Sequence, residues 1–212
     1  MSLKQYLPYY KRNLRVALPV MLTQLGASLV GLFDSIMVGH YATVDLAAVS
    51  FANALFFMAM VFAMGALMAI TPLVGVRVGE MNTRPEEQTE IRYKIAILFQ
   101  NGMLFTLLQS VLMLLLLGGC LPFLEYFGQD PAVIEVARPY YVLIVISLVP
   151  FLIFTFFKQF LEGLGNTLVA MIITLAMNAL NIFLNWIFIY GHWGVEAMGA
   201  TGAGIGSLIS RV

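Results

Sequence analysis

The sequence predicts an all-α protein that crosses a membrane several times. Of its 212 residues, 61% are hydrophobic and only 10% are charged, whereas about a quarter of the residues in a typical soluble domain are charged. The apolar residues form long runs, and about 20 apolar residues are enough for a helix to span a bilayer. Glycine is frequent, with 18 residues, as is usual where transmembrane helices pack closely.

The first three helices are expected between charged segments. The first covers about 14–38, and Asp34 is the only acidic residue inside any of the long apolar segments. A charge-free run predicts the second helix at 46–76, and another predicts the third at about 95–122. The loop at 79–91 mixes glutamates with an arginine, so we expect it to be a solvated connector.

The last three helices follow in the same way. The fourth is expected at 138–158, between Arg138 and Lys158, and the fifth at 167–190. The sixth begins near Gly199 and is still running at residue 212. About a dozen residues cannot cross a bilayer, so we expect a single lobe over 1–212 whose sixth helix is truncated.

The basic residues predict an orientation, because cytoplasmic loops are enriched in lysine and arginine. Arg138 is the only basic residue expected on the opposite side. We therefore predict a multi-pass protein of the inner (plasma) membrane with a cytoplasmic N-terminus. The residues expected on the cytoplasmic side are Lys4, Lys11, Arg12, Arg15, Arg77, Arg84, Arg92, Lys94 and Lys158.

Asp34 is the most informative single residue. A carboxylate in hydrocarbon costs several kcal/mol unless it is protonated, paired or bound to an ion, so intramembrane acids are functional by default. The direct hypothesis is that Asp34 carries a proton or a cation such as Na+ across the membrane. The alternative is a structural carboxyl group that is held by hydrogen bonds.

The fifth expected helix carries a stripe of polar side chains. Thr174, Asn178, Asn181 and Asn185 are spaced so that they share one face of a helix. The stripe either forms hydrogen bonds between helices or supplies amide groups that complete a cation or proton site with Asp34. The spacing leaves both interpretations open.

Two further polar or helix-breaking positions bear on Asp34. Pro19 lies within the first helix and favours a kink, which either is a static bend or is a hinge for the segment that carries Asp34. Asn53, in the second helix, lies at about the depth where a polar neighbour of Asp34 would sit.

Other classes of function find little support. The 11 basic and 11 acidic residues cancel, so no basic surface for nucleic acid is expected. Ser35 follows Asp34 directly, and neighbouring residues on a helix point about 100° apart, so they form no nucleophile–base pair. We therefore expect neither an enzyme nor a cofactor, and no metal site other than one for Na+.

The order and spacing of several short segments resemble the N-terminal half of the multidrug and toxic compound extrusion (MATE) family. Each segment is weak alone, but together they cover nearly the whole chain. They are Ala17–Pro19, Gln24, Asp34–Gly39, Leu46–Ser50, Thr71–Gly75, Gly79, Gln159–Thr167, Asn178–Gly191 and Gly199–Gly204.

The resemblance implies a twelve-helix secondary antiporter with two six-helix lobes, of which the C-terminal lobe is absent here. In family members with a cation site in the first lobe, an aspartate of helix 1 works with polar residues of helix 5. Asp34 matches that aspartate and Asn181 matches a helix-5 asparagine. Asn185 falls where some members carry a second acid, and Pro19 matches a proline at which helix 1 bends.

The functional hypothesis is export of cationic, amphipathic drugs or metabolites in exchange for Na+ or H+. The expected partners are a small organic cation, the bilayer and the missing C-terminal lobe. The candidate substrate-cavity residues are Gln24, Asn53, Phe57 and Thr174, with Phe33, Phe56, Met58 and Trp186 as further contributors.

Two alternatives stay open. A lipid-linked or polysaccharide flippase of a related fold would need several cationic side chains in its cavity, and this sequence offers only Arg211, at about the middle of the sixth helix. A non-transporting membrane scaffold subunit is the other alternative.

Overall fold

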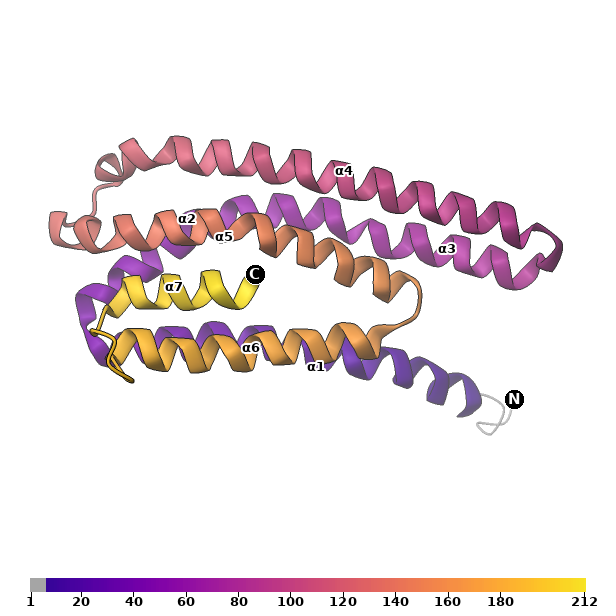
Figure 1. Cartoon of the computed structure of the whole chain (residues 1–212), viewed down its shortest axis with the longest axis horizontal. Helices are drawn as coiled ribbons and strands as arrows, with labels where there is room; N and C mark the ends of the chain where they lie inside the picture. The colour runs from indigo at the N-terminus through magenta and orange to yellow at the C-terminus, as the bar shows by residue number, and fades with distance from the viewer. Residues whose placement is uncertain (1–6) are drawn as a thin grey trace.

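The computed structural model describes residues 7–212, and every regular element within that range is a helix. Five helical segments there are long and apolar enough to cross a membrane, so the expected all-α polytopic architecture is confirmed. Figure 1 shows the helices side by side along one long axis. They are α1 (Leu7–Tyr41), α2 (Thr43–Met68), α3 (Ile70–Thr83), the 3-10 helix η2 (Pro85–Glu87), α4 (Gln88–Cys120), the 3-10 helix η3 (Leu121–Phe127), α5 (Pro131–Gly163), α6 (Thr167–Tyr190) and α7 (Gly199–Arg211).

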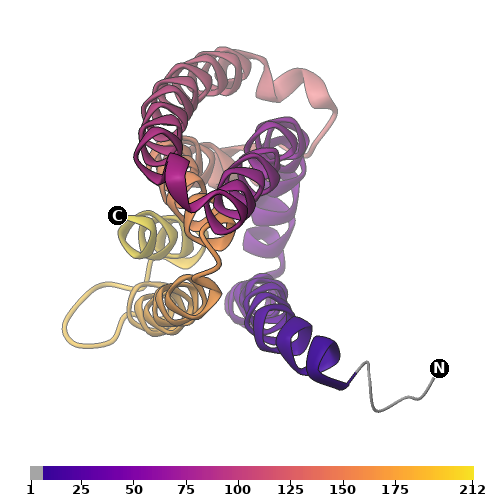
Figure 2. The ribbon, with the colours of Figure 1, turned by 90° about the vertical axis from the view of Figure 1, so that its right-hand side faces the viewer.

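Helix α5 is the centre of the bundle. It packs against α2, α3, α4 and α7, and its side chains Leu148, Leu152 and Phe156 are fully buried. Seen along the axis, α1 and α6 lie together on one side, and α3 and α4 lie on the other (Figure 2). Helix α7 packs against both α6 and α5.

The second expected span consists of two helices that meet at Ala69 rather than of one helix. Pro72 has no backbone N–H, so the carbonyl of Met68 loses its helical donor, and the ladder breaks one residue later. Thr71 then reaches α5, where its hydroxyl donates to the Gln159 side chain at 2.5 Å. At this break one backbone hydrogen bond is missing, and the Thr71 hydroxyl connects α3 with α5.

The helix starts follow from the sequence. Asp130 caps α5 by accepting from the Ala132 amide at 2.8 Å, and Asn166 caps α6 through the Val169 amide at 3.5 Å. Such caps satisfy amides that have no partner within the helix. The first amides of α7 are satisfied from elsewhere in the chain, because Asp45 of α2 accepts from the Ala200 amide at 2.6 Å.

Helix α7 lies very close to α6 because its contact face consists of small residues. At Gly202, a β-carbon would overlap the backbone carbonyl group of Phe188. Small residues allow membrane helices to approach in this way. The close approach sets the position of the polar end of α7, which includes Ser207, Ser210 and Arg211.

The structure does not describe the side chains of the basic residues before the first span. Lys4 lies outside the described residues, and the side chains of Lys11, Arg12 and Arg15 are not described either.

Candidate cation-binding site

Asp34 of α1 and Asn185 of α6 form a direct hydrogen bond. The Asn185 amide nitrogen donates to Oδ1 of Asp34 at 2.6 Å. Asn185 is fully buried, and Asp34 is partly buried within an apolar helix. An amide that donates to a carboxylate stabilises its charged form, so this contact makes an intramembrane acid tolerable.

The hydrogen bonds continue from Asn185 into α7. Asn185 also donates to Oδ1 of Asn181 at 3.3 Å, and Asn181 donates to the hydroxyl of Ser210 at 3.2 Å. Asn181 also lies 3.5 Å from the hydroxyl of Ser207. Three helices therefore share one polar network, which fixes the orientation of the Asp34 carboxyl group.

A small cavity of about 140 Å³ adjoins this network. Its lining includes the carboxyl-bearing Asp34 and the guanidinium-bearing Arg211, which are not joined by a direct ion pair in the part of the chain that the structure describes. The volume suits a small ion with a few waters rather than a drug, since ligand pockets are typically several hundred Å³. The lining residues are Ala27, Val30, Asp34, Phe151, Met177, Asn178, Asn181, Ser207, Ser210 and Arg211.

Arg211 is the residue whose place in this site the sequence did not predict. Its Nη1 donates to the hydroxyl of Ser147 on α5 at 2.7 Å. Its guanidinium carbon lies 5.0 Å from the ring centre of Phe151 and 5.6 Å from that of Phe56. The signal in the sequence was a lone charge inside a segment of small residues. The sequence could not place Arg211 at the depth of Asp34, because that depth depends on how closely α7 approaches α6.

The other members of the polar stripe take different roles. Asn178 lines the cavity, but it makes no bond to Asp34, and its buried amide nitrogen has no hydrogen-bond partner among the described residues. Thr174 is buried and donates to the carbonyl of Ala170 in its own helix at 2.8 Å. Helical spacing therefore predicted correctly that these side chains share one face. Among the described residues of the stripe, only Asn181 and Asn185 form hydrogen bonds to α7 or α1.

The candidate substrate-cavity residues lie apart from Asp34. Asn53 accepts from the hydroxyl of Tyr140 at 3.0 Å, and it lines an apolar groove of about 400 Å³ on α2 with Phe56 and Phe57. Gln24 is exposed on α1 and is not among the residues that line the Asp34 cavity. Neither residue touches the carboxyl group.

Three more of the sequence candidates occupy other positions. Pro19 is buried within α1, and its carbonyl accepts from the hydroxyl of Thr23 at 2.8 Å. Trp186 stacks on His192, with ring centres 3.8 Å apart, so its contact belongs to the end of α6. Phe33 is exposed on α1.

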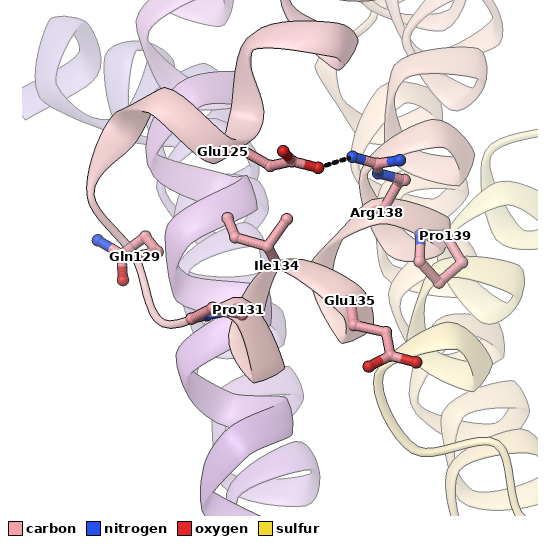
Figure 3. Close-up of a pocket in the computed structure, with 7 residues that line it drawn as sticks. All are labelled: Glu125, Gln129, Pro131, Ile134, Glu135, Arg138 and Pro139. Carbon is pink, nitrogen blue, oxygen red and sulfur yellow. Dashed lines mark hydrogen bonds and ion pairs between the residues drawn. The ribbon is translucent and has the colours of Figure 1, made fainter.

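A larger cavity lies elsewhere. It measures about 550 Å³ and is formed where η3 turns into α5, as Figure 3 shows. Its charged groups are Glu135 and the surface ion pair of Glu125 with Arg138, whose atoms lie 2.8 Å apart. The paired side chains are largely exposed, and such pairs contribute little. The intramembrane cavity at Asp34 is therefore the better functional candidate.

Replacing Asn185 with alanine is expected to destabilise the protein through the Asp34 contact. A hydrogen bond to a charged group contributes about 1.5–3 kcal/mol, and the loss should lower the thermal midpoint in detergent. The same substitution in an Asp34→Asn background should cost clearly less, because the charge is gone. Asn101→Ala, on an exposed asparagine of α4, is the control, and equal costs in both backgrounds would show that the negative charge of Asp34 adds nothing to the contact.

The comparisons with known proteins agree with this arrangement. Residues 19–187 match the MatE family model. The chain belongs to the MatE family. This match confirms the resemblance seen in the sequence, and the family consists of membrane transporters rather than enzymes.

Individual relatives of the MatE family place this chain more closely. It is 31% identical over 204 residues to the multidrug resistance protein NorM of Photobacterium profundum, which covers 94% of this chain and 43% of the relative. The probable multidrug resistance protein NorM of Bacillus subtilis is 30% identical over 209 residues, with 94% and 42% covered. The chain thus spans less than half the length of these curated relatives.

Solved transporter structures share the fold. A crystal structure of a MATE protein in the bent conformation has a TM-score of 0.78 at 21% identity and covers 95% of this chain and 42% of that one. A MOP superfamily transporter from Pyrococcus furiosus has a TM-score of 0.75 at 20% identity, with 95% and 42% covered.

Proposed function

We propose that the full-length protein exports small amphipathic organic cations in exchange for Na+ or H+. Membership of the MatE family and the likeness to NorM multidrug resistance proteins support export of drugs or metabolites. The observation that carries the exchange is the intramembrane carboxyl group of Asp34, which Asn185 holds at 2.6 Å beside a small polar cavity.

The exchange follows from what these residues can do. Asp34 takes up H+ or Na+ from outside, and the carboxyl group loses the charge that makes it costly in hydrocarbon. Asn185 and Asn181 transmit this change to α7, because they connect the carboxyl group with Ser210. Helix α1 moves about Pro19, and the substrate leaves a central cavity to which Asn53 and Phe57 of α2 contribute one wall.

The proposed orientation places the protein in the inner (plasma) membrane with its N-terminus in the cytoplasm. Arg84, Lys94 and Lys158 lie near one end of the bundle, at the α3–α4 turn and the end of α5 (Figure 1). Cytoplasmic ends carry most of the basic residues. The opposite end has Arg138 at the start of α5, paired with Glu125.

A lipid-linked or polysaccharide flippase is the second candidate, and Arg211 is the observation that favours it. An anionic headgroup would need cationic partners in the cavity. In the described part of the chain, Arg211 is the only basic residue that lines the Asp34 cavity, and Asp34 offsets its charge. Organic-cation export therefore fits the site better.

The function is tested with inverted membrane vesicles that contain the full-length protein. The vesicles are loaded with either Na+ or acid, and accumulation of a fluorescent organic cation is recorded. We expect accumulation with one of the two gradients, and that gradient identifies the coupling ion. Vesicles without a gradient and vesicles without the protein are the controls. Absence of accumulation under both gradients would contradict the proposal and favour the flippase or a scaffold subunit.

A further inference from the structure

Arg211 is held in a defined place by neighbours on two other helices. Ser147 of α5 accepts from its Nη1 at 2.7 Å, and Ser147 is fully buried. The rings of Phe56 on α2 and Phe151 on α5 lie within cation–π distance, at 5.6 and 5.0 Å. These contacts hold the guanidinium group beside the cavity that Asp34 also lines.

The hydroxyl that Arg211 contacts is a weaker hydrogen-bond acceptor than the Asp34 carboxylate nearby. A serine hydroxyl is a neutral acceptor, whereas a carboxylate forms a charge-assisted bond with a guanidinium group that is roughly twice as strong. Oδ1 of Asp34 accepts from Asn185, and Oδ2 has no hydrogen-bond partner among the described residues. Arg211 and Asp34 therefore form a separated charge pair whose members share one small cavity.

We propose that Arg211 is a tethered cation that competes with the coupling ion for Asp34. This inference rests on the proposed function, because it assumes that Asp34 binds the ion. With the ion on Asp34, Arg211 stays on Ser147. When the ion leaves, the guanidinium group swings to the carboxylate and neutralises it.

The competition gives Arg211 two effects on transport. It weakens ion binding, because a unit positive charge in the same low-dielectric cavity repels a second one. It also removes the cost of an unpaired carboxylate after release. Both effects favour release of the ion, which a carrier needs as much as uptake.

The other described groups around Asp34 carry no positive charge that could compete with the coupling ion. The polar side chains that α6 presents to it are neutral amides, and Ser207 and Ser210 of α7 are neutral hydroxyls. On α5, Tyr140 lies within electrostatic range of both Asp34 and Arg211, but its hydroxyl donates to Asn53 at 3.0 Å. Among the described residues facing the cavity, Arg211 is therefore the one cation available to compete.

The test measures ion binding to the purified full-length protein in two ways. Radiolabelled Na+ at fixed pH gives the half-saturating concentration. Difference infrared spectroscopy against Asp34→Asn gives the pH midpoint for protonation of the Asp34 carboxyl group. In Arg211→Gln we expect the half-saturating Na+ concentration to fall about tenfold or more, or, if Na+ does not bind, the protonation midpoint to rise by about one pH unit or more.

Ser147→Ala provides a test of opposite sign. Without the serine hydroxyl, the guanidinium group is released toward Asp34, so both measurements should shift in the direction opposite to Arg211→Gln. Arg211→Lys keeps the charge and should stay close to the wild type. Arg138→Gln removes an exposed arginine from the outer end of α5 and is the charge-matched control, for which no change is expected.

The outcomes separate the two proposals. The competition would be overturned if the half-saturating Na+ concentration of Arg211→Gln stayed within about twofold of the wild type, or its protonation midpoint within about 0.3 pH unit. Loss of the signal in Asp34→Asn would then leave the proposed function intact. A shift of Ser147→Ala in the same direction as Arg211→Gln would also overturn the competition. Unchanged ion binding in Asp34→Asn would reject the competition together with the assignment of Asp34.

Discussion

Asp34→Asn is expected to abolish gradient-driven transport while leaving the protein folded. Asparagine keeps the shape of the side chain, and its Oδ1 can still accept from Asn185, which donates to Asp34 at 2.6 Å. It cannot carry a negative charge, however, and so it cannot hold a proton or a metal cation at neutral pH. Ion affinity should fall on the order of a hundredfold or more, because a direct charge contact is lost inside a low-dielectric bundle.

The measurement is accumulation of the fluorescent organic cation in inverted vesicles under whichever gradient drives the wild type. Glu135→Gln removes an exposed acid near the N-terminal end of α5 and should transport normally, so it controls for expression and for loss of a negative charge. If Asp34→Asn transports at the wild-type rate, Asp34 is a structural carboxyl group and the ion binds elsewhere in the full-length protein.

Gly202→Leu is expected to prevent α7 from docking on α6. A single β-carbon at this position would already clash with the backbone carbonyl group of Phe188. A backbone group cannot relieve the clash by changing rotamer, as a side chain can. Overpacking a core with extra methylenes typically costs about 1–3 kcal/mol, and a clash with backbone belongs at or above the top of that range. Because α7 carries Arg211 and Ser210, ion binding should be lost together with stability.

The check is the yield of monodisperse protein and its thermal midpoint in detergent. Gly118→Leu is the matched control, because its glycine is exposed on α4 and a β-carbon there would meet nothing within 4 Å. Gly118→Leu should be neutral or slightly stabilising, since leucine, like alanine, favours a helix more than glycine does. A Gly202→Leu protein with normal yield and midpoint would mean that the two helices can separate at little cost.

The sequence predicted those parts of the site that depend on one helix at a time. Asp34 stood out because the cost of a carboxylate in hydrocarbon does not depend on the partner that relieves it. The shared face of Asn181 and Asn185 followed from helical periodicity. The all-helical fold likewise followed from the length and spacing of the apolar runs.

The rest depended on distances between helices. Periodicity assigns a face but no depth, so it could not separate Asn185, which reaches Asp34, from Asn178, which does not. Thr174 satisfied its hydroxyl within its own helix, a local option that spacing alone cannot exclude. The place of Arg211 beside Asp34 needed the close contact at Gly202 and the hydroxyl of Ser147, neither of which one helix reveals.

The bond between Arg211 and Ser147 also places the site within the electric field of the membrane. Along α5, Ser147 lies nine residues after Arg138 and eleven before Lys158, which is roughly 14 Å and 17 Å at the rise of a helix. A hydrocarbon core of about 30 Å would therefore have Ser147 and the anchored end of Arg211 near its midplane. An ion that reaches Asp34 crosses part of the membrane potential, and a full crossing is worth roughly 2.3 kcal/mol per charge at 100 mV. Voltage would thus act on uptake and on release alike, even without a chemical gradient of the ion.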